Sequence, residues 1–159
     1  MHRRELLKLG VFAIPSAWAQ QASKPDWTPT FLDDHQNETV IALTDAIIPA
    51  TDTPGAKAAL VNRYIDLFLR DGEPWQREHF VAGLNFLDGR AIETHGHPFV
   101  HLTAAQQTNV LHSIESHEFF RLAKGVTANI YYNTQIGYQE LNKGGRVPSA
   151  VGCTHESHA

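Results

Sequence analysis

Cysteine and long apolar runs are both scarce in this chain of 159 residues. Cys153 is the only cysteine, so the chain cannot form an internal disulfide, and this thiol is either free or half of an intermolecular bridge. After the first 20 positions no segment approaches the roughly 20 consecutive apolar residues that a membrane-spanning helix requires. The composition therefore points to one globular domain that is not stabilised by disulfides.

Basic residues are also few. The chain has 13 Lys and Arg against 17 Asp and Glu, a formal net charge of −4, and three of the basic residues lie within the first eight positions. The remainder is more acidic still and has no basic stripe. This charge distribution argues against nucleic acids and anionic membrane surfaces as partners.

The motifs of common catalytic and cofactor sites are missing as well. The sequence has no G-x-G-x-x-G, no phosphate loop, no H-E-x-x-H and no G-x-S-x-G, and it lacks the C-x-x-C-H of covalent haem. A di-iron site in a helical bundle would need paired E-x-x-H segments, which are also missing. We therefore expect no catalytic residue and no bound cofactor in this chain.

The N-terminus has the pattern of an export signal. Arg3 and Arg4 form a basic start, an apolar stretch covers residues 9–14, and Ala-Trp-Ala at 17–19 is a small-x-small cleavage pattern. Paired arginines are typical of the twin-arginine route, which exports folded proteins that often carry a redox cofactor. We predict a signal peptide at 1–19 and a periplasmic location.

The rest of the chain is predicted to be all-α. Residues 20–32 read as a linker or arm, residues 33–141 as a helical domain, and the glycine-containing segment 142–159 as an extended tail. Apolar periodicity within the domain predicts an irregular bundle of about five helices. Their expected ranges are 33–48, 54–71, 74–92, 104–114 and 118–135.

Several local signals support these boundaries. Thr53 and Pro54 suit the cap and first position of the second helix, and Thr103 with Gln106 forms a capping-box sequence for the fourth. The apolar positions of the second helix are Leu60, Val61, Tyr64, Ile65, Phe68 and Leu69. Gly83 and Gly89 are expected to weaken the third helix.

The histidines suggest an alternative, in which the chain binds a metal ion. His95, His97 and His101 form an H-x-H-x3-H cluster that could bind zinc or copper, which would make the chain a periplasmic metal-binding protein. The competing interpretation is a polar loop whose histidines cap helices or face solvent. A second cluster places His155 and His158 beside Cys153.

Two aromatic pairs, Phe119-Phe120 and Tyr131-Tyr132, are each expected to give one ring to the core and leave the other near the surface. Exposed aromatic rings favour protein contacts, because they bury a large area at a low cost in conformational entropy. Core packing alone is the simpler interpretation.

Parts of the sequence resemble a known family. Residues 41–56, 61–66, 119–122 and 131–141 are similar to the small subunit, subunit 3, of membrane-bound gluconate 2-dehydrogenase and related sugar dehydrogenases. The segment 152–155 resembles the tails of the same family. With the signal, the resemblance spans most of the chain.

The resemblance implies a non-catalytic subunit in an oxidoreductase complex. In that family a large subunit carries FAD and the chemistry, a cytochrome c subunit often accepts the electrons, and the small subunit assists export and stability of the flavoprotein. Membrane association would then arise only through partners. We accordingly expect Arg3 and Arg4 to direct export and Cys153 to form an intersubunit disulfide. Pro49, within the turn 49–56, and the pair Tyr131 and Tyr132 are the expected partner surface.

Overall fold

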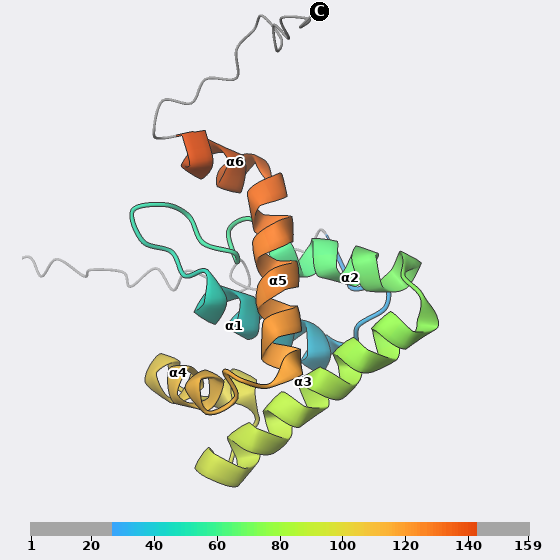
Figure 1. Cartoon of the computed structure of the whole chain (residues 1–159), viewed down its shortest axis with the longest axis vertical. Coiled ribbons are helices and arrows are strands. Elements are labelled where there is room, and N and C mark those ends of the chain that lie inside the picture. The colour runs from blue at the N-terminus through green and yellow to red at the C-terminus, as the bar shows by residue number, and fades with distance from the viewer. Residues whose placement is uncertain (1–26, 143–159) are drawn as a thin grey trace, which may run out of the picture.

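The computed structural model describes residues 27–142. Within that range the chain forms six α-helices, one 3₁₀ turn and no strand, which confirms the all-α prediction (Figure 1). Arg3, Arg4 and Cys153, with the predicted signal and most of the predicted tail, lie outside the described residues. The elements are α1 (Asp34–Ile47), α2 (Val61–Asp71), α3 (Pro74–His95), η2 (Phe99–His101), α4 (Ala104–Ser113), α5 (Glu118–Asn133) and α6 (Gln135–Asn142).

The first helix begins and ends close to the predicted positions. Asp33 caps it: the Asp33 Oδ1 atom accepts a hydrogen bond from the Gln36 amide at 2.7 Å, and the Gln36 side chain accepts one from the Asp33 amide. These two bonds satisfy amides that have no partner within the helix. Val40 and Leu43 are buried on its inner face.

The second helix starts later than predicted. Thr53 and Pro54 precede a series of turns, and α2 begins only at Val61, because the chain first folds back onto the end of α1. The Ala56 amide donates to the Ile48 carbonyl at 2.9 Å. A Cβ atom on Gly55 would lie 2.5 Å from the Ala50 nitrogen, so this close backbone approach requires glycine.

The third helix starts at Pro74 as predicted but runs to His95, through part of the expected loop, and ends at Gly96 with a φ of 78°. Gly83 lies directly beneath the ring of Phe119 on α5. A Cβ atom there would come within 1.8 Å of that ring, so this glycine is needed for packing, whereas Gly89 faces open space.

The capping box predicted at Thr103 and Gln106 is present at the start of α4. The last predicted helix, 118–135, corresponds to α5, which ends at Asn133, and a further helix, α6, follows it. Gly137 makes this junction possible: a Cβ atom there would lie 2.1 Å from the Tyr131 carbonyl oxygen. Our prediction of about five helices thus missed α6.

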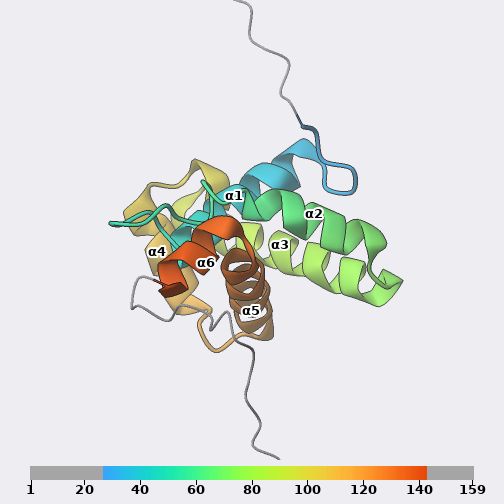
Figure 2. The ribbon, with the colours of Figure 1, turned by 90° about the horizontal axis from the view of Figure 1, so that it is seen from above.

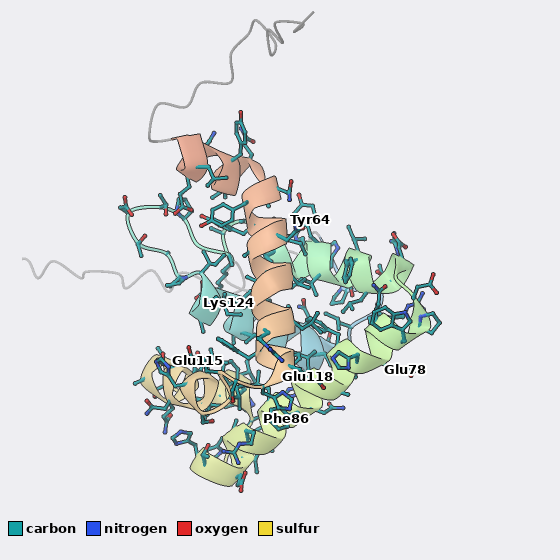
Figure 3. All side chains as sticks on the ribbon, viewed as in Figure 1. Tyr64, Glu78, Phe86, Glu115, Glu118 and Lys124 are labelled. Carbon is teal, nitrogen blue, oxygen red and sulfur yellow. The ribbon has the colours of Figure 1, made fainter. Side chains whose placement is uncertain are left out.

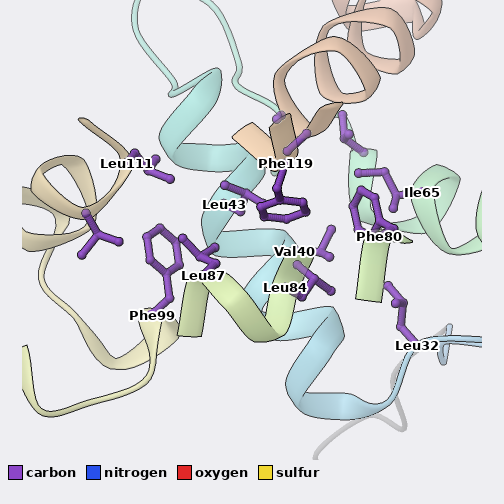
Figure 4. Close-up of a cluster of buried hydrophobic side chains, with 14 of the residues drawn as sticks. Leu32, Val40, Leu43, Ile65, Phe80, Leu84, Leu87, Phe99, Leu111 and Phe119 are labelled. Carbon is purple, nitrogen blue, oxygen red and sulfur yellow. The ribbon is translucent and has the colours of Figure 1, made fainter. Parts of the chain in front are cut away.

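The helices enclose one hydrophobic core, with α5 standing against α1 and α2 (Figures 1 and 2). Phe80 on α3 meets Phe119 on α5 edge to face, with 5.8 Å between ring centroids. Figure 4 shows these rings among Leu43, Ile65, Leu84 and other buried side chains, so Leu32 and helices α1 to α5 share one core. None of the helices between residues 27 and 142 has the length and apolar character needed to cross a membrane.

Candidate partner-binding surface on α2

Helix α2 presents three different sides. Its residues advance by about 100° each around the axis, so positions four apart lie on the same side. Val61, Ile65 and Leu69 form a row with essentially no solvent exposure, packed into the core. The other two sides of α2 differ from each other: one contacts the segment before α1, and the other carries the candidate site.

One side of α2 binds the segment that precedes α1. The Asp66 side chain is fully buried, and its Oδ1 atom accepts hydrogen bonds from the amides of Phe31 and Leu32 at 2.9 and 2.8 Å. Its Oδ2 atom accepts from the amide and the hydroxyl of Thr30 at 2.8 and 2.7 Å. We call residues 27–32 the arm.

The charge on Asp66 is stabilised by these contacts. Burial by itself raises the pKa of a carboxyl group, but here the hydrogen bonds from Leu32, Thr30 and Phe31 together outweigh burial. The pKa of Asp66 is therefore held below its usual value of 3.8. An ionised carboxylate is what four converging donors require.

Aromatic side chains of the arm also contact basic residues on α2 and α3. The guanidinium of Arg63 lies 5.3 Å from the centroid of the Trp27 ring, and that of Arg77 lies 5.8 Å from the Phe31 ring. The described part of the segment predicted as a linker is therefore attached along α2.

The third side of α2 is apolar and uncovered. Leu60, Tyr64 and Phe68, spaced four residues apart, are 42, 50 and 43% exposed, and we call them the α2 stripe. A shallow groove runs beside it toward α5, and Figure 3 shows Tyr64 at this boundary. The groove is lined by Tyr64, Leu67, Phe68, Asp71, Gly72 and Ile130.

Leu60 is held in an unusual backbone conformation. Its φ of 56° and ψ of 36° place it in the left-handed region, and it is the one non-glycine residue with positive φ in the described range 27–142. Glycine or asparagine occupies that region at little cost, whereas a leucine there is strained by about 1 kcal/mol. A large exposed apolar side chain at this position is not explained by folding alone.

The groove beside the α2 stripe has one charged lining residue, Asp71, whose side chain pairs with that of Arg70 at 2.7 Å. The basic residues nearby in the sequence lie elsewhere: Arg63 packs on the Trp27 ring of the arm, and Lys57 lines a different hollow together with Glu38 and Asp45.

Of the residues predicted to form a partner surface, Tyr131 is misassigned. It is fully buried, and its hydroxyl shares its hydrogen between the Pro54 carbonyl oxygen and Glu140 Oε2, each 2.7 Å away. Burial, with the hydrogen bond and charge of Glu140, raises its pKa to about 12. Tyr131 thus joins the turn after α1 to α5 and α6, whereas Pro49 and Tyr132 are exposed.

The aromatic pairs otherwise follow the predicted pattern, since Phe119 and Tyr131 are buried while Phe120 and Tyr132 lie nearer the surface. Tyr132 belongs to a second exposed apolar area at the junction of α5 and α6. We call it the α5–α6 corner, and its members are Tyr132, Tyr138 and Leu141.

The predicted histidine cluster is not assembled into a ligand set. His95 ends α3, His97 lies in the following loop and His101 ends η2. In the part of the chain from 27 to 142, no group of three or more His, Cys, Asp or Glu side chains is arranged to hold a metal ion. His155 and His158 lie outside the described residues.

The sequence reveals the α2 stripe but not the contacts of Asp66. Asp66 gives no local signal, because an aspartate inside a helical pattern normally faces solvent and nothing nearby in the chain indicates its partners. The α2 stripe is visible in the sequence, since adjacent apolar pairs such as Leu60-Val61 and Tyr64-Ile65 form a band wider than one buried row needs.

Comparison with known proteins identifies a family. The family model described as gluconate 2-dehydrogenase subunit 3 matches residues 34–145, which include every helix from α1 to α6. No curated protein and no solved structure matches the chain.

Proposed function

Because the chain belongs to the gluconate 2-dehydrogenase subunit 3 family, we propose that it is the non-catalytic small subunit of an FAD-dependent sugar, aldonate or alcohol dehydrogenase complex. The family match over the whole helical domain carries this proposal. The flavin chemistry would belong to a large partner subunit, and a cytochrome c subunit would accept the electrons in complexes that contain one.

The surface of the helical domain is consistent with such a role. It exposes two apolar areas, the α2 stripe and the α5–α6 corner, which a subunit interface would remove from water. A small domain that covers apolar surface of a larger protein stabilises that protein's folded state by binding it in preference to its unfolded state.

The export role rests on the first residues of the sequence. We propose that Arg3 and Arg4 belong to a twin-arginine signal that directs this chain, together with the folded flavoprotein bound to it, to the periplasm. Replacing both arginines with lysine should leave the flavoprotein activity in the cytoplasmic fraction. Continued periplasmic activity in that variant would contradict the export role.

A covalent link is proposed for Cys153, which has no other cysteine in the chain to pair with. In an oxidising compartment it would form a disulfide with a cysteine of the large subunit. Non-reducing gels of the purified complex should show a band of the combined mass that disappears with reductant and in Cys153→Ser. An unchanged mobility in both cases would eliminate the bridge.

The decisive experiment is purification of the tagged chain from cells that also express its neighbouring genes. We expect a large protein to co-purify and the eluate to show flavin absorbance and dehydrogenase turnover with an artificial electron acceptor. A colourless eluate containing this chain alone would refute the proposed function. Metal analysis of the same eluate tests the alternative based on His95, His97 and His101.

A further inference from the structure

We propose that Tyr131, Glu140 and the Pro54 carbonyl form a pH-sensitive latch, which closes fully when the Glu140 carboxyl group takes up a proton. The closed latch bonds α6 and the turn 49–56 to the same buried hydroxyl on α5. Loss of the proton weakens the contact and frees the last turn of α6. The latch lies within this chain and does not depend on the proposed function.

The first observation is that one hydroxyl hydrogen faces two acceptors. The Tyr131 hydroxyl oxygen lies 2.7 Å from the Pro54 carbonyl oxygen and 2.7 Å from Glu140 Oε2. A phenol has one hydrogen to donate, and a carbonyl or an ionised carboxylate can only accept. With Glu140 ionised, the single hydrogen therefore cannot form a full hydrogen bond to both oxygens.

A proton on Glu140 removes this conflict. The Glu140 O–H then donates to the Tyr131 oxygen, and the Tyr131 O–H donates to the Pro54 carbonyl, so each short contact contains its own hydrogen. Tyr131 keeps its hydrogen in neutral and acidic solution, because its pKa is raised to about 12. The group that changes between neutral and acidic pH is thus Glu140.

The second observation is burial. Tyr131 is fully buried and Glu140 is half-buried. Water therefore has little access to the hydroxyl oxygen and cannot readily supply the missing hydrogen. A polar contact that lacks a hydrogen is costly away from water, so the network is more stable with the additional proton.

The third observation is that the segments around Glu140 offer no cation to an ionised carboxylate. Residues 49–56 and 129–142 contain no Lys, Arg or His, and the next basic residue, Lys143, lies outside the described residues. The charged side chains of α5 lie in its first half, at least seven positions before Tyr131. The other titratable side chains of these segments are Asp52 in the turn, Tyr131 and Tyr132 on α5, and Tyr138 on α6.

The fourth observation is the position of the carboxyl group at two helix ends. Glu140 lies in the last turn of α6, and its partner Tyr131 lies in the last turn of α5, which ends at Asn133. The carbonyl groups at the C-terminal end of a helix carry partial negative charge, which disfavours a carboxylate there. Both helices therefore favour the neutral form of Glu140.

The latch acts on the second turn of α6, because the first turn is held separately. The Gly137 amide donates to the Thr134 hydroxyl at 3.2 Å, and the Tyr138 amide donates to the Thr134 carbonyl at 2.9 Å. Figure 1 shows α6 across the end of α5. Opening of the latch would thus release the segment that carries Glu140 and Leu141, and with it part of the α5–α6 corner.

The experiment measures amide hydrogen exchange of the purified full chain at pH 7.5 and 4.5, with each rate divided by that of an unstructured peptide at the same pH. The readout is protection of the last turn of α6, and α4 is the internal reference. Glu140→Gln has an amide that donates to Tyr131 at every pH, Tyr131→Phe removes the latch, and Glu78→Gln on the exposed surface of α3 is the matched control. Thermal melts confirm that each variant is folded.

Protection of α6 in the unchanged chain should rise about fivefold from pH 7.5 to 4.5, the effect of one additional neutral hydrogen bond. Glu140→Gln should show the higher protection at both pH values, and Tyr131→Phe the lower protection at both. Glu78→Gln should behave as the unchanged chain does. This combination would establish the latch.

Three results would overturn the inference. Equal protection of α6 at both pH values in the unchanged chain would mean that no proton is taken up when the latch closes. Low protection in Glu140→Gln, as in Tyr131→Phe, would mean that the ionised carboxylate makes the contact. A change in α4 equal to that in α6 would assign the pH dependence to the whole helical domain.

Discussion

The two outer sides of α2 belong to the same eleven-residue helix but differ in almost every respect. On the arm side, the buried Asp66 carboxylate accepts hydrogen bonds from Thr30, Phe31 and Leu32. On the other side, Tyr64 and Phe68 expose about half of their surface to solvent. A polar residue binds the arm on one side of α2, whereas apolar side chains remain exposed on the other.

This contrast separates residues that fold the chain from residues that folding does not need. Substitutions in the buried row and on the arm side should change the free energy of unfolding. Substitutions in the α2 stripe should leave it nearly unchanged. Each prediction below tests one side of this division.

The largest loss of stability is expected in the buried row. Ile65→Ala removes a buried side chain and leaves a cavity, so the free energy of unfolding should fall by about 3 kcal/mol. Phe68→Ala, three positions along the same helix, should lower it by less than about 1 kcal/mol, because most of its surroundings are solvent. Urea titrations of both variants measure the difference. Equal losses would mean that Phe68 belongs to the folded core.

A smaller loss is expected on the arm side. Asp66→Asn keeps one acceptor oxygen but removes the charge that four donors share, so the free energy of unfolding should fall by about 2 kcal/mol. Limited proteolysis should also cut the arm faster. Asp71→Asn is the matched control, since Asp71 is exposed and should be almost neutral.

The pH dependence provides a second test of Asp66. Its pKa is lower in the folded chain than in the unfolded chain, so its contribution to stability is complete above the unfolded value near 4. That contribution disappears as the pH falls through the folded pKa. Asp66→Asn should therefore lose less stability than the unchanged chain between pH 4 and more acidic conditions. Parallel acid titrations would contradict the arm contact.

The elements whose signals are local agree with the sequence prediction. The capping box of Thr103 and Gln106, the first position of Pro74 and the acidic residues at the start of α1 each act within one helical turn. Because their physical cause is contained in a few adjacent residues, the starts of α1, α3 and α4 can be located from the sequence alone.

The errors have causes that lie far apart in the sequence. Pro54 has the pattern of a helix start, but the Ala56 amide bonds to Ile48 and delays α2. Gly137 has the pattern of a helix end, yet it permits α6 to pack on the Tyr131 carbonyl. Asp66 has the pattern of a solvent-facing residue, but Thr30 folds back onto it. Periodicity within a window cannot reveal such contacts.

The turn that leads into the α2 stripe can be loosened at Tyr131. Tyr131→Phe keeps the buried ring but removes the hydroxyl that bonds to Pro54 and Glu140, which should cost about 1 kcal/mol of stability. Unchanged stability in urea would mean that water replaces the hydroxyl without loss.

Alkaline titration provides a second test of Tyr131→Phe. The pKa of Tyr131 is raised from 10.0 to about 12 in the folded chain, so the hydroxyl contributes its full stability below pH 10. This contribution is lost as the pH rises from 10 toward 12. Tyr131→Phe should therefore show a shallower decline of stability over that interval, and identical curves would show that the phenol is not buried.

The smallest effect on stability is expected at Leu60, where the two sides of the comparison meet. Leu60→Gly relieves a left-handed strain of about 1 kcal/mol, but it also gives the unfolded chain more freedom, worth a similar amount. The two terms nearly cancel, so the urea midpoint should barely move. If the α2 stripe lies in the subunit interface, recovery of the flavoprotein should nevertheless fall, because this exposed apolar side chain is gone. Leu60→Asn retains the left-handed preference with a polar side chain and should behave in the same way. A large drop in stability with normal recovery would show that Leu60 serves the fold, and the division between the two sides of α2 would then begin at Tyr64.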